Sequence, residues 1–96
     1  MESEFVPREL WVRASAVGFN EPWEDATTIE ELERWIWEKH RDWFPKYHPT
    51  SVNGYDYDVY VNNAFIGEFP DPFSARLAGV TRVIEELEKG VKDGRF

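Results

Sequence analysis

The sequence predicts a small α+β domain in which an antiparallel sheet of about three strands packs with two α-helices, in the order β-α-β-β-α. Two segments with helical periodicity flank a pair of alternating segments that are separated by Asn62-Asn63. The chain is 96 residues long and 42% apolar, which suits one domain, 1–96, with its own core.

The first apolar segment, residues 10–17, fits two structures. Alternation places Leu10 and Val12 on one face of a strand, whereas a helix would begin after Pro7 and end at Gly18. The strand is preferred because the later strands need a sheet partner.

The next segment predicts the clearest helix. Thr27 or Thr28 can cap it, because each is followed three residues later by a glutamate, as in a capping box. Pro45 ends the helix, since the residue before a proline is disfavoured in the α conformation. Residues 45–54 are then expected to form a loop. The apolar stripe of this helix consists of Ile29, Leu32, Ile36 and Trp43.

Residues 55–69 predict a β-hairpin. Asparagine tolerates the positive φ that a two-residue type I′ turn requires, so Asn62 and Asn63 are placed at the turn. Both faces of the hairpin carry apolar side chains, although the two helices can cover only one face, so the face with Tyr60 and Phe65 is expected to stay open. The expected cross-strand pairs are Val61–Ala64, Val59–Ile66, Tyr57–Glu68, Tyr60–Phe65 and Asp56–Phe69.

A second helix is predicted to open at Asp71-Pro72, an N-cap residue followed by proline at the first helical position. Gly90 is expected to stop it. The apolar stripe comprises Phe73, Leu77, Val80, Ile84 and Leu87.

The hairpin and this helix form a ββα unit with the local pattern Ile66-Gly67-x-Phe69 followed by Ala75. This unit resembles the arm-binding hairpin–helix modules of phage-type tyrosine recombinases over about a third of the chain. Those modules place basic residues on the sheet. This hairpin instead contains acidic residues and neither lysine nor arginine, so the resemblance assigns no functional residue here.

The charge balance excludes several functions. Eleven basic and 19 acidic residues give a net charge of −8, which disfavours direct binding to nucleic acid and to anionic membranes. The absence of cysteine excludes a disulfide framework and thiol chemistry. The acidic residues 1–4 and the lack of a long apolar run predict no secretory signal and no membrane span, so a cytoplasmic location is expected.

The acidic residues are concentrated between positions 20 and 38. Seven carboxylates against Arg34 alone leave −6 of the net charge in this segment. Carboxylates around tryptophans are typical of an interface that meets a basic partner, but an ordinary solvated helix face explains the same pattern. The candidate partner-binding residues, with the aromatic sheet face included, are Glu21, Trp23, Glu24, Asp25, Glu30, Glu31, Trp37, Tyr60 and Phe65.

Candidates for catalysis are few. His40 and His48 lack a recognised zinc spacing, and a partly buried His40 with a surface His48 is the simpler interpretation. Asp56 and Asp58 share one strand face, where they could hold a metal or simply discourage edge aggregation. No nucleophile elbow or phosphate-binding loop occurs, so neither an enzyme nor a cofactor is predicted.

Three functional hypotheses follow. The first is a non-catalytic domain that docks on a basic protein surface, as phage or mobile-element inhibitors of restriction and CRISPR enzymes do; the likeness to those inhibitors is one of size and charge. The second is a structural domain that forms homodimers through Tyr60 and Phe65. The third is a small metal-dependent enzyme that would use His40, His48, Asp56 and Asp58.

Overall fold

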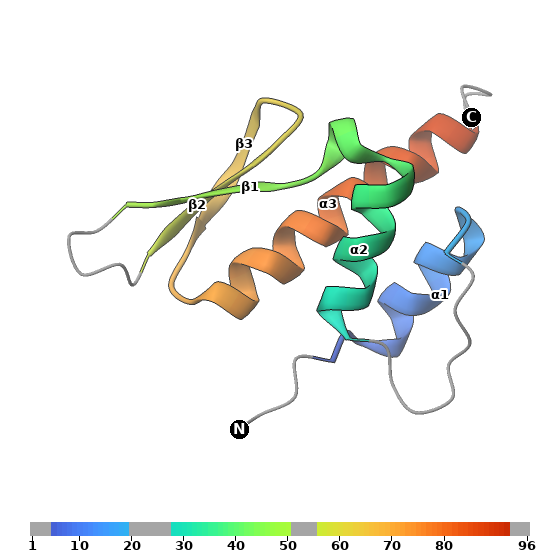
Figure 1. Cartoon of the computed structure of the whole chain (residues 1–96), viewed down its shortest axis with the longest axis horizontal. Helices are drawn as coiled ribbons and strands as arrows, with labels where there is room; N and C mark the ends of the chain where they lie inside the picture. The colour runs from blue at the N-terminus through green and yellow to red at the C-terminus, as the bar shows by residue number, and fades with distance from the viewer. Residues whose placement is uncertain (1–4, 20–27, 51–55, 93–96) are drawn as a thin grey trace.

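The structure, a computed structural model, describes residues 5–19, 28–50 and 56–92. These residues form three α-helices, one short 3₁₀ helix and a three-stranded antiparallel sheet. The mixed α+β class is confirmed, whereas the order of elements is α-α-β-β-β-α. The elements are α1 (Arg8–Ala16), α2 (Ile29–Lys39), the 3₁₀ helix η1 (Arg41–Trp43), β1 (Lys46–Pro49), β2 (Tyr57–Val61), β3 (Ala64–Phe69) and α3 (Pro72–Lys92) (Figure 1).

The preference for a strand over residues 10–17 is wrong, because this segment belongs to α1. Leu10 and Ala14 lie four residues apart on one helical face and are 5% and 0% exposed. Val12, which a strand would place on the same face as Leu10, is 50% exposed. The alternative interpretation is the correct one, and α1 begins directly after Pro7 as that interpretation predicts.

The third strand is β1, which lies in a segment that the sequence pattern assigns to a loop. It pairs antiparallel with β2, with His48 opposite Asp58. Its sequence, Lys46-Tyr47-His48-Pro49, has little apolar alternation, and Tyr47 is the one residue of β1 that is not exposed. Pro49 is tolerated because β1 is an edge strand, whose outer side needs no backbone donor. Pairing with β2, rather than a local apolar pattern, therefore defines this strand.

The hairpin turn is confirmed by positive φ values of 50° at Asn62 and 68° at Asn63. Two of the predicted pairs are confirmed, and the other three are wrong because a bulge between Val59 and Tyr60 shifts the register. The shift places two carboxylates, those of Asp58 and Glu68, directly opposite each other. The observed pairs are Val61–Ala64, Tyr60–Phe65, Val59–Gly67, Asp58–Glu68 and Tyr57–Phe69.

Helix α2 begins as predicted and ends earlier. The Thr28 hydroxyl accepts a hydrogen bond of 3.2 Å from the backbone N–H of Glu31, so Thr28 is the cap. The predicted continuation to Pro45 is wrong, because His40 leaves the helical conformation with φ −139° and ψ 48°. The turn of η1 follows, and its last residue, Trp43, packs against the core.

Helix α3 begins at its predicted cap. The Asp71 carboxylate accepts a hydrogen bond of 2.8 Å from the backbone N–H of Ser74. The predicted stop at Gly90 is wrong, because α3 continues to Lys92. Gly90 is buried, and tertiary packing overrides its weak helix propensity. Among the residues that the structure describes, no helix combines the length and apolar character that a membrane span requires.

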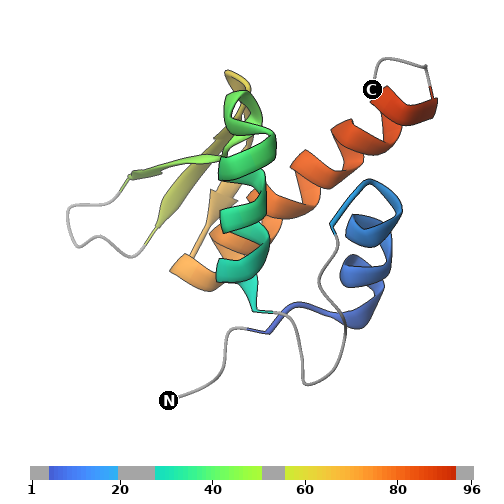
Figure 2. The same cartoon turned by 45° about the vertical axis from the view of Figure 1, so that its right-hand side comes forward.

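The core lies between α3 and the elements that surround it. α3 contacts α1, α2 and all three strands, so it is the central element of the fold. Figures 1 and 2 show the three helices gathered on one side of the sheet, which leaves its other face without a helix. The core cluster consists of Val6, Leu10, Ala14, Phe19, Ile29, Leu32, Ile36, Val61, Val80, Val83, Ile84 and Leu87.

Candidate functional site

The face of the sheet that points away from α3, here called the open sheet face, is the candidate site. On β2 the side chains of Val59 and Val61 are 0% and 2% exposed, so they point toward α3. Alternation then places the intervening residues of β2 on the open sheet face, together with the residues that pair with them. The residues of this face are Lys46, His48 and Thr50, then Asp56, Asp58 and Tyr60, then Phe65 and Glu68.

Three rings form a row across the open sheet face, one from each strand. The centroids of His48 and Tyr60 are 5.4 Å apart at an interplanar angle of 78°. Those of Tyr60 and Phe65 are also 5.4 Å apart, with the rings tilted by 58°. Both distances lie in the range of favourable aromatic contacts. Phe65 still exposes 58% of its surface, which confirms the expectation that the helices leave this face open.

Carboxylates occupy the same face beside the rings. Asp58 on β2 and Glu68 on β3 are direct cross-strand neighbours, and Asp56 directly precedes β2. The Thr50 hydroxyl donates a hydrogen bond of 2.9 Å to the Glu68 carboxylate and so fixes its position. None of the ion pairs within residues 5–19, 28–50 and 56–92 involves these three carboxylates. Like charges opposite each other destabilise a sheet slightly, and an external cation would relieve that repulsion.

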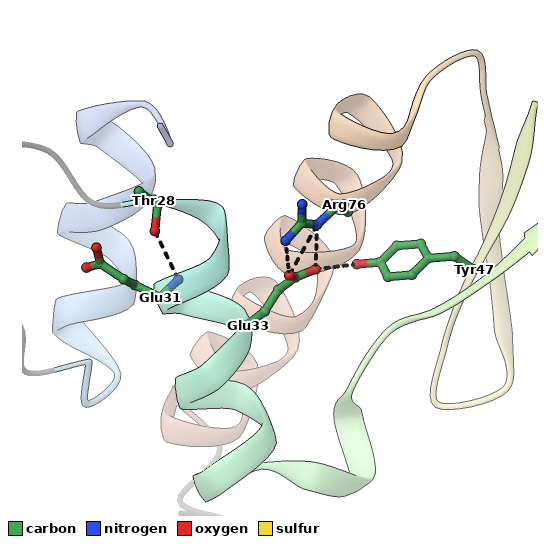
Figure 3. Close-up of polar contacts among 5 residues, drawn as sticks. All are labelled: Thr28, Glu31, Glu33, Tyr47 and Arg76. Carbon is green, nitrogen blue, oxygen red and sulfur yellow. Dashed lines mark hydrogen bonds and ion pairs between the residues drawn. The ribbon is translucent and has the colours of Figure 1, made fainter. Parts of the chain in front are cut away.

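A polar network beneath the sheet holds β1 in place. The Arg76 guanidinium on α3 donates hydrogen bonds of 3.2 and 3.1 Å from Nε to the two carboxylate oxygens of Glu33 on α2. The Tyr47 hydroxyl on β1 donates one of 3.3 Å to the same carboxylate. Figure 3 shows the three side chains converging from α2, α3 and β1. Burial, reinforced by the negative charge of Glu33, raises the pKa of Tyr47 far above its ordinary value, so its hydroxyl stays a donor.

A close approach between α3 and the start of β1 complements that network. A Cβ atom added to Gly79 would lie 2.8 Å from Cβ of Pro45 and 3.1 Å from the Tyr47 hydroxyl. Glycine therefore gives the space in which Pro45 and Tyr47 pack on α3. Through these contacts, the two helices determine where the aromatic and acidic residues of β1 and β2 lie.

The predicted partner-binding residues do not all lie on one surface. Four of them, Glu21, Trp23, Glu24 and Asp25, fall outside the described residues. Glu30 and Glu31 lie in the first turn of α2, and Glu31 points toward α1 rather than toward the sheet (Figure 3). Tyr60 and Phe65 are brought together on the open sheet face.

Trp37 lies on a different surface, near the end of α2, and is 49% exposed. The Arg41 guanidinium lies 4.6 Å from its ring centroid, and the Phe44 ring meets it edge-on at 5.4 Å. The Arg41 contact is within the range of a cation–π interaction. Trp37 is thus held by its own neighbours, and nothing at this position indicates a ligand.

The residues proposed for a metal-dependent enzyme are divided between two surfaces. His40 is half-buried at the end of α2, where its ring contacts Trp35 at 5.2 Å. Burial lowers the pKa of His40 below its ordinary value. His48, Asp56 and Asp58 lie on the open sheet face. Among the described residues, no three such side chains are arranged so that they could hold a metal ion together.

A hollow of about 750 Å³ lies on the side of α2 that faces the end of α1. Phe19 and Trp35 line it, with their rings 5.5 Å apart, and both acidic and basic side chains surround it. Arg34 and Lys39 offset Glu31 and Glu38 there, so the hollow has no dominant charge. Its mixed lining does not indicate a ligand class.

Sequence reasoning missed the contribution of β1 to the site. The sequence pattern predicts a loop over residues 45–54, so it places neither His48 nor Thr50 on a sheet face. The sequence pattern pairs Glu68 with Tyr57, and the bulge pairs it with Asp58 instead. No local signal in the sequence marks either feature.

Comparison with known proteins does not identify a relative: no protein-family model matches the sequence, and neither a curated protein nor a solved structure matches it. The functional assignment therefore depends on the geometry and charge of the open sheet face.

Proposed function

We propose that this chain is a non-catalytic protein-binding domain that docks on a basic partner surface through its open sheet face. The observation that supports this most directly is the exposure of Phe65, 58%, in an aromatic row that adjoins Asp58 and Glu68. Full burial of a phenylalanine side chain stabilises by roughly 1.5–3 kcal/mol, so Phe65 has apolar surface left to contribute to a complex.

The carboxylates supply the second part of the proposal. Aromatic anchors hold a complex together, whereas charges at an interface steer the approach and reject partners of like charge. The net charge of −8 extends this preference to the whole molecule. Glu30, exposed at the start of α2, adds to the long-range field without belonging to the open sheet face.

A more specific proposal concerns the identity of the partner. A basic protein surface is often one that binds nucleic acid, and a small acidic domain can occupy it. We therefore extend the proposal to an inhibitor, of phage or mobile-element origin, of a restriction or CRISPR enzyme in the cytoplasm. The size and charge of the chain support this more specific proposal.

Homodimerisation through the same face is the second candidate, because Tyr60 and Phe65 offer apolar surface to a second copy as well. The charges disfavour it. Each copy would bring three carboxylates, those of Asp56, Asp58 and Glu68, into the interface against one lysine, Lys46.

The test is affinity capture from cells of the source organism with the wild-type chain and with Phe65→Asp. We expect a partner with a basic surface that wild type retains, that moderate salt elutes and that Phe65→Asp fails to retain. Both proteins should have the same melting temperature, because Phe65 lies outside the core.

Phe5→Asp is the matched control, since Phe5 is a similarly exposed phenylalanine, at 44%, outside the sheet. It should retain the partner. Equal retention by Phe65→Asp and wild type would contradict the proposal, and so would a partner whose binding is insensitive to salt.

A further inference from the structure

We infer that the partner contacts the open sheet face through arginine side chains carried on an extended segment. This inference rests on the proposed function and adds the chemistry of the partner to it. It follows from the neighbouring positions of rings and carboxylates on one face of three paired strands. Phe65 and Glu68 are exposed there, and Tyr60 and Asp58 are half-buried.

Rings and carboxylates are close enough for one kind of side chain to use both. Tyr60 and Asp58 are two residues apart on β2, which corresponds to roughly 7 Å along a strand. Their cross-strand partners on β3, Phe65 and Glu68, are three residues apart, because the bulge adds one residue between them. A planar guanidinium stacks on an aromatic ring through its face and donates paired hydrogen bonds to a carboxylate through its edge. Arginine therefore fits both halves of this surface.

Lysine fits it less well. Its ammonium group is compact and strongly hydrated, so it pairs with a carboxylate as a point charge and gains less from a ring face. The exposed ring of Phe65 would then contribute little to binding. The carboxylate of Glu68, already held by Thr50, presents a fixed acceptor that suits the fork of donors in arginine.

The position of Lys46, the lysine of the open sheet face, indicates where the arginine binds. Lys46 and His48 both belong to β1, on one side of the central strand. Among the residues of the open sheet face, those of β3 are the aromatic Phe65 and the acidic Glu68. An incoming cation is therefore expected over β2 and β3, away from Lys46.

Spacing indicates that the segment is extended. In an extended chain, side chains two residues apart point the same way and lie roughly 7 Å apart. This matches the distance between the aromatic pair and the carboxylate pair on the face. Arginines separated by one residue would place one guanidinium on the rings and the next between Asp58 and Glu68.

The test uses two short acetylated peptides, one alternating glycine with arginine and one alternating glycine with lysine. Each is titrated into the ¹⁵N-labelled full chain and followed by NMR. We expect saturable shifts confined to β2, β3 and their side chains, with the arginine peptide binding about two- to fivefold more tightly, as expected for an exposed cation–π contact. Phe65→Ala should abolish this preference, and Phe5→Ala should preserve it.

Equal affinities for the two peptides would overturn the inference, as would shifts centred outside the open sheet face or no binding at all. Tighter binding of a single-stranded oligonucleotide to the same face would also overturn it. The proposed function is judged separately, by partner capture with Phe65→Asp. A captured partner that binds normally after its arginines are replaced by lysine would refute the inference and leave the proposed function standing.

Discussion

Glu33 shows how one residue can determine the position of several elements. Its side chain, 13% exposed, accepts hydrogen bonds from Arg76 of α3 and from Tyr47 of β1. A carboxylate so enclosed is stable only because its partners replace the water it has lost. Phe65 is the opposite case, since its side chain is largely exposed and its ring contacts that of Tyr60 in the aromatic row. The first residue holds the fold together, and the second is available to a partner.

Glu33→Gln should therefore destabilise the fold. The amide keeps the size of the side chain but removes the negative charge with which the Arg76 guanidinium, only 23% exposed, forms an ion pair. We expect a loss of roughly 1.5–3 kcal/mol in the free energy of unfolding, measured by urea denaturation.

Glu30→Gln is the matched control, because Glu30 is exposed on the same helix and its charge contributes little to stability. If the two variants unfold at the same urea concentration, the network does not hold α2 and β1 on α3.

At the scale of elements, α3 organises the molecule through different contacts on its different sides. Its apolar stripe packs in the core, and its N-terminal half meets β1 where Gly79 leaves room for Pro45. Near its C-terminal end, Glu88 pairs with Arg13 of α1. The Arg13 guanidinium donates hydrogen bonds of 3.1 Å from Nε and 2.7 Å from Nη2 to the two oxygens of that carboxylate. This pair is a polar connection between α1 and α3.

The hydrogen bonds from Arg13 lower the pKa of Glu88 below its ordinary value. A carboxyl group whose pKa is lower in the folded state stabilises the fold above its unfolded pKa, and loses this effect as the pH falls through the folded value. At pH 7 we expect Glu88→Gln to unfold more easily than wild type by less than about 1 kcal/mol, since both side chains are more than a third exposed. The melting temperatures of the two proteins should converge in strong acid.

Glu30→Gln is again a suitable control, as Glu30 is exposed on α2 and none of the described hydrogen bonds or ion pairs includes its side chain. A difference between wild type and Glu88→Gln that persists unchanged in acid would show that the charge of Glu88 is not its source.

At the scale of the whole molecule, the layers leave one sheet face without a helix, and the chain carries a net charge of −8. An exposed apolar row would by itself favour self-association. The carboxylates beside the row oppose it, because a second copy presents the same charges. The balance favours a partner of opposite charge.

We therefore expect the chain to remain a monomer in sedimentation equilibrium at moderate protein concentration and physiological salt. Salt screens repulsion between exposed charges, so any association should strengthen as ionic strength rises. A tight dimer at low salt that Phe65→Asp dissociates would instead favour the homodimer hypothesis.

The sequence by itself determines those features of this protein that depend on residues adjacent in the chain. The Asn62-Asn63 turn needs only two residues that accept positive φ, and the start of α3 needs only Asp71 followed by Pro72. The α+β class follows from the same local periodicities, and the exposure of Phe65 follows from a hairpin that is apolar on both faces.

The tertiary structure alone decided the rest. Residues 10–17 fit both the alternation of a strand and the periodicity of a helix, and packing on α3 selects the helix. β1 exists because β2 offers it an edge and because Tyr47 reaches Glu33, neither of which is visible in four mostly polar residues. The bulge that sets Asp58 against Glu68 is likewise a property of the paired strands. Local patterns determine what a segment can form, but contacts between distant segments determine which form is stable and which side chains it leaves exposed.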